Sequence, residues 1–192
     1  MRDVRLPDRI ETKRLSLRPL RMSDAPRIAR FCNDPRVGRN LAMTPLPYLQ
    51  AAAEGWIMIL AARAPLSEDF VFAVDLEGEG LVGVIGAHGR GGEAFEIGYW
   101  FGRQFWGQGL ATEALRGLVG QADHLGPLQS GHFIDNPASG RVLEKGGFAY
   151  TGETEHSFSM ARGARVATKR MRYESERGRG EVKCRSVAAQ AQ

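Results

Sequence analysis

The chain has 192 residues, 43% of them hydrophobic, and a net charge of +4, as expected for one globular domain with a substantial core. Its apolar runs fall short of the ~20 residues that a membrane helix needs, and the charged N-terminus lacks the apolar middle of a signal peptide. Two distant cysteines exclude a disulfide framework and a cysteine metal site, so a reducing cytoplasm is the expected location.

The first predicted elements are a strand and a short helix. Residues 14–20 alternate in polarity as a strand does, with Leu15 and Leu17 on the buried side. Ser23 is placed to cap a helix that stops before the Asn-Asp-Pro sequence at residues 33–35. Prolines and a glycine between residues 35 and 47 then predict a loop that could border a substrate cleft.

A helix and a three-stranded meander are predicted next. Residues 48–64 carry apolar side chains at helical spacing. Two strands follow at residues 70–76 and 81–87, joined by a Glu-Gly-Glu-Gly turn, and glycines at 89, 91 and 92 mark a second turn. The third strand turns its side chains alternately to two faces: Glu96, Gly98 and Trp100 on one, and Phe95, Ile97, Tyr99 and Phe101 on the other.

A glycine turn separates that strand from an amphipathic helix. Gly107-Gln108-Gly109 precedes Leu110, where apolar residues begin to recur at helical spacing. Such a turn leaves backbone N–H groups pointing outward, and the helix dipole adds about half a positive charge, so it suits a phosphate or pyrophosphate. A simple tight turn is the alternative. Neither a P-loop nor a complete dinucleotide fingerprint is present.

The last third of the chain predicts one more strand, one helix and a final pair of strands. The strand covers residues 128–134, and the helix is opened by Pro137 and closed by two glycines at 146 and 147. The final strands cover residues 148–154 and 167–173, with a polar hairpin loop at 155–166 between them. About seven strands and four helices are expected, as a mixed α/β sheet with helices on both faces.

Basic residues concentrate at the C-terminal end. From Met160 onward there are nine Lys or Arg against three Asp or Glu, whereas the preceding residues are slightly acidic. A solvated strand followed by a disordered basic tail at residues 176–192 would account for this excess. A patch for nucleic acid or an acidic partner is the alternative, although aromatic residues do not interleave with the charges as in a single-strand binder.

Three stretches, in the same order, resemble a known family. Residues 106–115, WGQGLATEAL, are similar to the acetyl-CoA-binding motif of the GCN5-related N-acetyltransferase (GNAT) superfamily. Residues 136–148, NPASGRVLEKGGF, resemble a signature of its ribosomal-protein N-terminal acetyltransferase (RimJ/RimL-like) branch. Residues 12–25 are similar to the first strand and helix of that branch. The resemblance implies the GNAT fold, with one GNAT domain over residues 1–175.

The resemblance also implies acetyl-CoA as co-substrate, an amine acceptor and no metal. In the family the glycine turn holds the cofactor's pyrophosphate, the preceding strand pairs with the pantetheine arm, and an asparagine contacts that arm. Carried over to this chain, the positions are Gly107, Gln108, Gly109, Leu110, Ala111 and Thr112 for the pyrophosphate, Tyr99, Trp100 and Phe101 for the arm, and Asn136. An ordinary helix N-cap is the alternative role of Asn136.

Two residues are candidates for acid–base chemistry. Glu96 lies on the strand that should meet the cofactor, where some relatives place a base, and a carboxylate can take the amine's proton directly or through a water. A structural carboxylate is its alternative role, and His156 is another candidate base. Ser139 matches a serine with which this branch protonates the departing thiolate, and its alternative role is to cap its own helix.

The best-known acid and base of the wider family do not carry over. Leu143 stands where many relatives have a tyrosine, and residues 131–135 lack a glutamate. Two functions are therefore kept: an N-acetyltransferase that acts on a protein N-terminus or small amine by direct attack in a ternary complex, and a non-catalytic acyl-CoA sensor.

The acceptor and the oligomeric state stay open. Residues 35–47 and 155–166 should line the acceptor pocket, but neither segment carries a motif that identifies the amine. A homodimer is not excluded, whereas membrane association and nucleic-acid binding are not expected.

Overall fold

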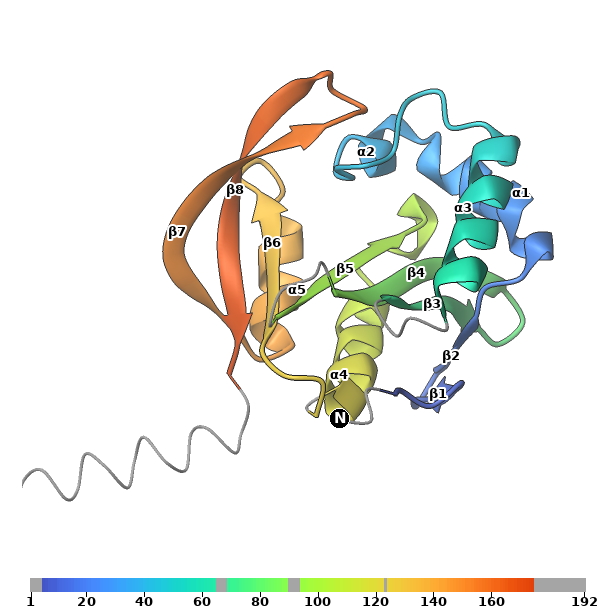
Figure 1. The fold of residues 1–192 in the computed structure, drawn as a ribbon, viewed down its shortest axis with the longest axis horizontal. Coiled ribbons are helices and arrows are strands. Elements are labelled where there is room, and N and C mark those ends of the chain that lie inside the picture. The colour runs from blue at the N-terminus through green and yellow to red at the C-terminus, as the bar shows by residue number, and fades with distance from the viewer. Residues whose placement is uncertain (1–4, 65–68, 90–93, 123, 175–192) are drawn as a thin grey trace, which may run out of the picture.

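The computed structural model describes residues 5–64, 69–89, 94–122 and 124–174, and within them eight strands form one sheet (Figure 1). The strands are β1 (Ile10–Glu11), β2 (Leu15–Pro19), β3 (Asp69–Leu76), β4 (Gly80–Gly89), β5 (Phe95–Phe101), β6 (Leu128–Phe133), β7 (Phe148–Ser159) and β8 (Ala164–Tyr173). The helices are α1 (Ala25–Cys32), α2 (Pro35–Gly38), α3 (Gln50–Arg63), α4 (Leu110–Ala122) and α5 (Pro137–Lys145), with 3-10 turns η1 (Met22–Asp24) and η3 (Arg103–Phe105).

The expected mixed sheet is confirmed. Its strand order is β1-β2-β3-β4-β5-β6-β8-β7. Neighbouring strands are antiparallel except β5 and β6, which run parallel. The described residues hold one strand and one helix more than expected, namely the two-residue β1 and the single-turn α2, which lies within the predicted loop 35–47.

The predicted hairpin loop at residues 155–166 is wrong. β7 and β8 pair through most of it, up to Ser159 opposite Ala164, so only residues 160–163 form the turn. Most of β7 is exposed on both faces. Without a buried face it lacks the alternation of polarity that identifies a strand in a sequence. The predicted tail at 176–192, and residues 90–93 of the predicted glycine turn, lie outside the described residues.

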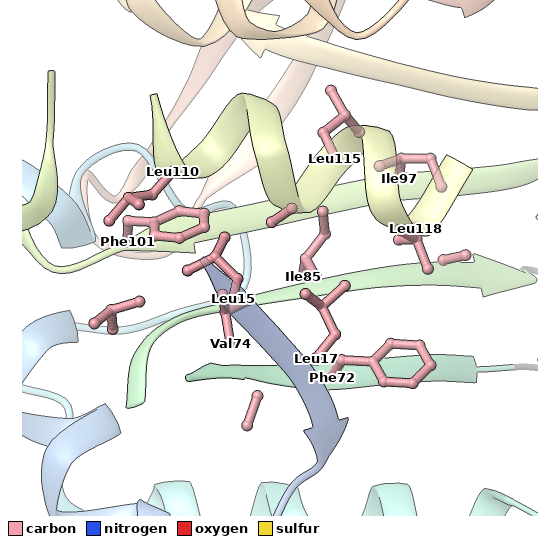
Figure 2. Close-up of a cluster of buried hydrophobic side chains, with 14 of the residues drawn as sticks. Leu15, Leu17, Phe72, Val74, Ile85, Ile97, Phe101, Leu110, Leu115 and Leu118 are labelled. Carbon is pink, nitrogen blue, oxygen red and sulfur yellow. The ribbon is translucent and has the colours of Figure 1, made fainter. Parts of the chain in front are cut away.

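One hydrophobic core lies between α4 and the sheet (Figure 2). Leu115 and Leu118 of α4 belong to one buried cluster with Ile97 of β5 and Ile85 of β4. This packing confirms the apolar face predicted for the helix. It also fixes the start of α4, at Leu110, beside the end of β5.

Helices α1 and α3 cover the other face of the sheet. Phe31 of α1 meets Trp100 of β5 edge-on, with ring centroids 6.5 Å apart, and meets Phe105 in the same way at 6.0 Å. Both faces of β5 are therefore packed at its C-terminal end. Within the described ranges, no helix combines the length and the apolar run needed to cross a bilayer.

A buried ion network ties the N-terminal strand to η1. Arg18, with 8% of its surface exposed, bonds both carboxylate oxygens of Asp24 at 2.8 and 2.9 Å and both of Asp75 at 2.6 and 2.9 Å. Asp24 also accepts the N–H of Arg21 at 2.8 Å, at the start of η1. The expected cap Ser23 instead lies inside η1, and α1 begins at Ala25 without a side-chain cap. Burial opposes the charge of Asp24, but the bonds from Arg18 and Arg21 outweigh it and hold the pKa of this carboxyl below its ordinary value.

We expect the substitution Arg18→Met to lower the free energy of unfolding at pH 7 by about 3–5 kcal/mol, because it leaves the Asp24 carboxylate buried without its partner. Because folding lowers the pKa of Asp24, its contribution is present above the unfolded-state pKa of about 3.9 and is lost as pH falls through the folded value. The deficit of the variant should therefore shrink below pH 4. Urea unfolding at several pH values measures it, with the exposed Arg36→Met as control, and equal midpoints for wild type and R18M would contradict it.

Candidate active site

The parallel strands β5 and β6 separate shortly after they begin. They pair only at Phe95 and Glu96 of β5. The point where the two strands part is called the apex here. The buried Ser130 of β6 holds β5 there, because its hydroxyl donates to the Ile97 carbonyl at 2.8 Å. Beyond that point the strands diverge, as Figure 1 shows. The second half of β5 therefore presents an unpaired backbone edge toward β6.

The backbone N–H and C=O groups of successive residues point alternately to the two sides of a strand, which shows which groups of β5 face the gap. Since the Ile97 carbonyl faces β6, the N–H and C=O of Tyr99 face the gap and those of Trp100 face β4. The Phe101 carbonyl, also on the gap side, accepts the indole N–H of Trp106 at 2.8 Å. An extended molecule in the gap would meet the N–H and C=O of Tyr99 and the N–H of Phe101.

The glycine turn leads directly into α4. Gly107 and Gly109 have φ angles of +76° and +77°, a conformation that favours glycine. A Cβ on Gly107 would meet no atom within 4 Å, so its backbone conformation, and not lack of space, requires glycine there. The N–H of Glu113 bonds the Gly109 carbonyl at 3.0 Å. No described residue accepts from the N–H groups of residues 110–112, which open the helix.

An arginine from the bend between β1 and β2 clamps this turn. Glu113, in the first turn of α4, accepts the Thr12 hydroxyl at 2.8 Å and the backbone N–H and Nε of Arg14 at 2.7 Å each. Arg14 Nη1 donates to the Gln108 carbonyl at 3.1 Å. Burial opposes the charge of Glu113, but bonds from Thr12 and Arg14 hold its pKa below the ordinary value. The sequence analysis did not single out either member of this clamp.

An open groove of about 650 Å³ runs beside the clamp. Four cations contribute to its lining together with two carboxylates: Lys13, Arg14, Arg116 and Lys145, with Glu11 and Glu113. Because Gly109 and Thr112 also line it, the groove continues from the mouth of α4. Its surplus of positive charge suits anionic groups.

Ser139 and Tyr99 meet on the α5 side of the sheet. The Tyr99 hydroxyl lies 2.9 Å from Ser139 Oγ and 3.0 Å from the Ser139 carbonyl oxygen, to which it can donate. Burial raises the pKa of Tyr99, partly offset by the bond to Ser139, so its side chain stays a neutral phenol. The side chain of Asn136 accepts the N–H of Ser139 at 3.4 Å, so its alternative role as helix N-cap is present. The sequence predicted Ser139, but not its phenol partner.

Glu96 forms a two-pronged ion pair on the opposite face of the sheet. Its carboxylate accepts Nη1 and Nη2 of Arg170 at 2.9 and 2.6 Å, and the two side chains are only 22% and 14% exposed. The bonds from Glu96 raise the pKa of Arg170. Glu96 thus has the structural role that the sequence analysis gave as its alternative. His156 is exposed and lies on the other face of β7 from Glu155, whose carboxylate is 3.7 Å from Arg170 Nε.

The two segments expected to line the acceptor pocket meet beyond the end of β6. Asp135 pairs with Arg39 at 2.8 Å and with Arg162 at 2.8 and 3.1 Å, and the bonds from Arg162 lower the pKa of its carboxyl. The N–H of Met160 donates to the Ala42 carbonyl at 2.9 Å. The turn of the β7–β8 hairpin is therefore tied to the segment after α2.

The fold and site together have the features of an acetyltransferase domain: two parallel strands separate, and a glycine turn and an open helix terminus lie beside the gap. The chain belongs to the GNAT family of acetyltransferases, because the model of the acetyltransferase (GNAT) domain matches residues 14–149.

Individual relatives agree with this assignment. An uncharacterized N-acetyltransferase, p20, of Bacillus licheniformis is 30% identical over 111 residues, or 56% of this chain and 62% of that protein, so the match spans less than two thirds of the relative. The structure of RimJ from Mycobacterium smegmatis with CoA-disulfide has a TM-score of 0.77 at 23% identity, covering 89% of each chain. The microcin C7 self-immunity acetyltransferase MccE, in complex with acetyl-CoA and AMP, gives 0.73 at 15%, covering 85% of this chain and 93% of MccE. These two structures share the fold.

We expect Glu96→Ala to lower the free energy of unfolding by about 1.5–3 kcal/mol, because it removes both charge-assisted hydrogen bonds of the half-buried Arg170. Glu96→Gln, which keeps one acceptor and the shape, should cost less. Urea unfolding measures both variants. Glu155→Ala is the matched control, since it removes an exposed and more distant carboxylate and should cost under about 1 kcal/mol. An E96A variant as stable as E155A would show that the ion pair contributes nothing.

Proposed function

We propose that this chain is an acetyl-CoA-dependent N-acetyltransferase that moves the acetyl group to a primary amine, either a protein N-terminus or a small molecule, by direct attack in a ternary complex. The observation that carries the proposal is the alignment of the unpaired edge of β5 with the glycine turn at the start of α4. A pantetheine arm that pairs with this edge would end with its diphosphate at the open N–H groups of the helix.

The residues present fit that cofactor. The N–H groups of Gly107, Gln108, Gly109, Leu110, Ala111 and Thr112 would hold the pyrophosphate. Tyr99 and Phe101 would pair with the pantetheine arm through the backbone groups that face the gap, and Trp100 would pack beside it. Asn136 would contact the arm from the α5 side while it caps the helix. The cationic groove beside Arg14 would take the nucleotide end.

The chemistry then needs three contributions from the protein. The Tyr99 N–H, which faces the gap, would polarise the thioester carbonyl. Ser139, held by the Tyr99 phenol, would protonate the departing thiolate. Glu96 is the base expected from the sequence, but Arg170 holds both its oxygens, so a proton would have to reach it through a water. Much of the rate should come from holding amine and thioester together.

A non-catalytic acyl-CoA sensor is the second candidate function. One observation favours it, namely the engagement of the expected base in a two-pronged ion pair. The two functions share the cofactor site and differ only in whether acetyl leaves the thioester. Cofactor binding and thiol release must therefore be measured separately.

For the enzyme we expect thiol release from acetyl-CoA to depend on an added amine. The panel should contain peptides with different N-terminal residues, polyamines, free amino acids and amine antibiotics, and mass spectrometry should find the acetylated product. Binding of coenzyme A without thiol release from any amine would support the sensor. No uptake of coenzyme A in titration calorimetry would contradict both functions.

We expect Gly109→Ala to weaken coenzyme A binding about tenfold, because a Cβ at positive φ costs about 1–2 kcal/mol and shifts the N–H groups of the turn. Gly120→Ala is the matched control, since a Cβ on Gly120 in the same helix would meet no atom within 4 Å. Calorimetry on both variants gives the comparison. Equal affinity of G109A and wild type would argue against a diphosphate at this turn.

The contacts of Arg14 with Glu113 and Gln108 give a second test of diphosphate binding at the glycine turn. We expect Arg14→Ala to weaken coenzyme A binding about tenfold, because Glu113 would be left as an unpaired carboxylate at the point where the helix attracts an anion. The double variant Arg14→Ala with Glu113→Gln should recover most of the affinity at low salt. If the double variant binds as weakly as R14A, then loss of the clamp's structure, and not charge, sets the affinity.

A further inference from the structure

Three acidic or basic side chains lie next to one another across the sheet at the apex of the gap. Asp69 of β3 stands opposite His88 of β4, and His88 stands opposite Glu96 of β5. Residues directly opposite in neighbouring strands share a face. This face, called the acceptor face here, is the one opposite to Ile97 and α4. An imidazole therefore lies between two carboxylates beside the place where β5 and β6 part.

Asp69 fixes the orientation and tautomer of this imidazole. Its Oδ1 lies 2.7 Å from His88 Nδ1, and a carboxylate can only accept, so Nδ1 carries the proton. In the neutral ring Nε2 then holds a free lone pair. No described residue hydrogen-bonds Nε2, and the His88 side chain is 29% exposed while that of Asp69 is 8% exposed. Nε2 is thus positioned and available to accept a proton.

The ring leans along β4 toward Gly86 on the acceptor face. His88 Nε2 lies 3.1 Å from where a Cβ on Gly86 would be. Gly86 stands opposite Gly98 of β5, and a Cβ on Gly98 would meet no atom within 4 Å. The Gly98 backbone is therefore uncovered on this face, whereas Gly86 is flanked by the His88 ring and by Val71, whose Cγ2 lies 3.0 Å from where a Cβ on Gly86 would be. Because Gly98 directly precedes Tyr99, an amine that approaches a thioester at Tyr99 from this face would pass beside Nε2.

The two carboxylates beside His88 are each paired with an arginine, so His88 is the group in this cluster that can take a proton. Asp69 binds the ring and also pairs with Arg63 of α3, whose Nη1 is 3.2 Å away. Glu96 faces the ring from β5, but Arg170 of β8 occupies both its oxygens. Each carboxylate thus has its own arginine, and of these groups Nε2 alone is a basic atom without a hydrogen bond. We propose that His88 is the general base of the acetyl transfer and that Asp69 is its positioning residue, an inference that rests on the function proposed above.

The proposed step conserves atoms and charge. The neutral amine nitrogen bonds to the acetyl carbon, and one of its protons moves to His88 Nε2. The carbon–sulfur bond breaks with its electron pair on sulfur, which takes a proton from the Ser139 hydroxyl. The imidazolium then returns its proton through water to the Ser139 oxygen. The products are the amide and the free thiol, with both side chains as they began.

The test is the substitution His88→Asn in the full chain, because the asparagine amide can still donate to Asp69 but cannot take up a proton. We expect kcat to fall about 10²-fold while the affinity for coenzyme A and the melting temperature stay within error. The rate of the wild type should fall toward acid pH as the imidazole is protonated, and H88N should lack this acidic limb. In Asp69→Asn we expect kcat to fall while the KM for acetyl-CoA stays unchanged, because Nδ1 loses the carboxylate that orients the ring.

Two controls keep the result interpretable. His124→Asn makes the same chemical change at an exposed histidine at the end of α4 and should keep the wild-type profile. His88→Ala should regain activity on addition of imidazole, and not of sodium chloride, which tests the base even if H88N folds poorly.

The possible failures are distinct. Full activity of H88N with its acidic limb intact, or loss of that limb in Glu96→Gln or His156→Asn instead, would overturn the role of His88 and leave the acetyltransferase standing. A wild type that binds acetyl-CoA but acetylates no amine would overturn the proposed function and the base together.

Discussion

The separation of β5 from β6 is the constraint on which the rest of the site depends. A parallel pair would normally continue to hydrogen-bond, and a buried backbone group without a partner costs about 1–3 kcal/mol. Here Ser130 closes the apex on Ile97, and α5 holds Tyr99 through Ser139 on one side of the opening. Neither contact uses the backbone N–H or C=O of Tyr99, which face the gap. The edge of β5 is consequently kept open for a molecule that can supply the missing hydrogen bonds.

At the start of α4 a carboxylate that stabilises the helix and an anionic ligand would both interact with the positive end of the helix dipole. A carboxylate in the first turn, such as Glu113, favours the helix because it faces the positive end of the dipole. The same charge opposes a diphosphate at that terminus. Arg14 reconciles the two requirements, since it neutralises Glu113 and at the same time holds the Gln108 carbonyl of the turn. The turn is thus supported by the bend between β1 and β2, which lies almost one hundred residues earlier in the chain.

Local patterns explain what the sequence predicts correctly. The strand at 95–101, the glycine turn and the helix from Leu110 are each specified by neighbouring residues, through alternation, positive φ or helical spacing. The ion pairs of the site are not. Glu96 and Arg170 are 74 residues apart, and Arg14 and Glu113 are 99 apart, so only the tertiary fold brings the members of each pair together. The same holds for Asp69 and His88, which became neighbours through the β3–β4 register.

Alternation along β5 also bears on the kinetic mechanism. Its odd-numbered residue Tyr99 reaches Ser139 on the α4 and α5 side, while Glu96 and Gly98 face the acceptor side, where His88 lies. A thioester held at the edge of the strand would be open to an amine from the acceptor side, while Ser139 lies on the other side of the sheet. Transfer through an acyl-enzyme would need an accessible nucleophile. The one cysteine within the described residues, Cys32, is 2% exposed on α1, and burial raises the pKa of its thiol to about 12. A thiol so buried and so weakly acidic is a poor carrier of the acetyl group, in keeping with the proposed attack by the amine in a ternary complex.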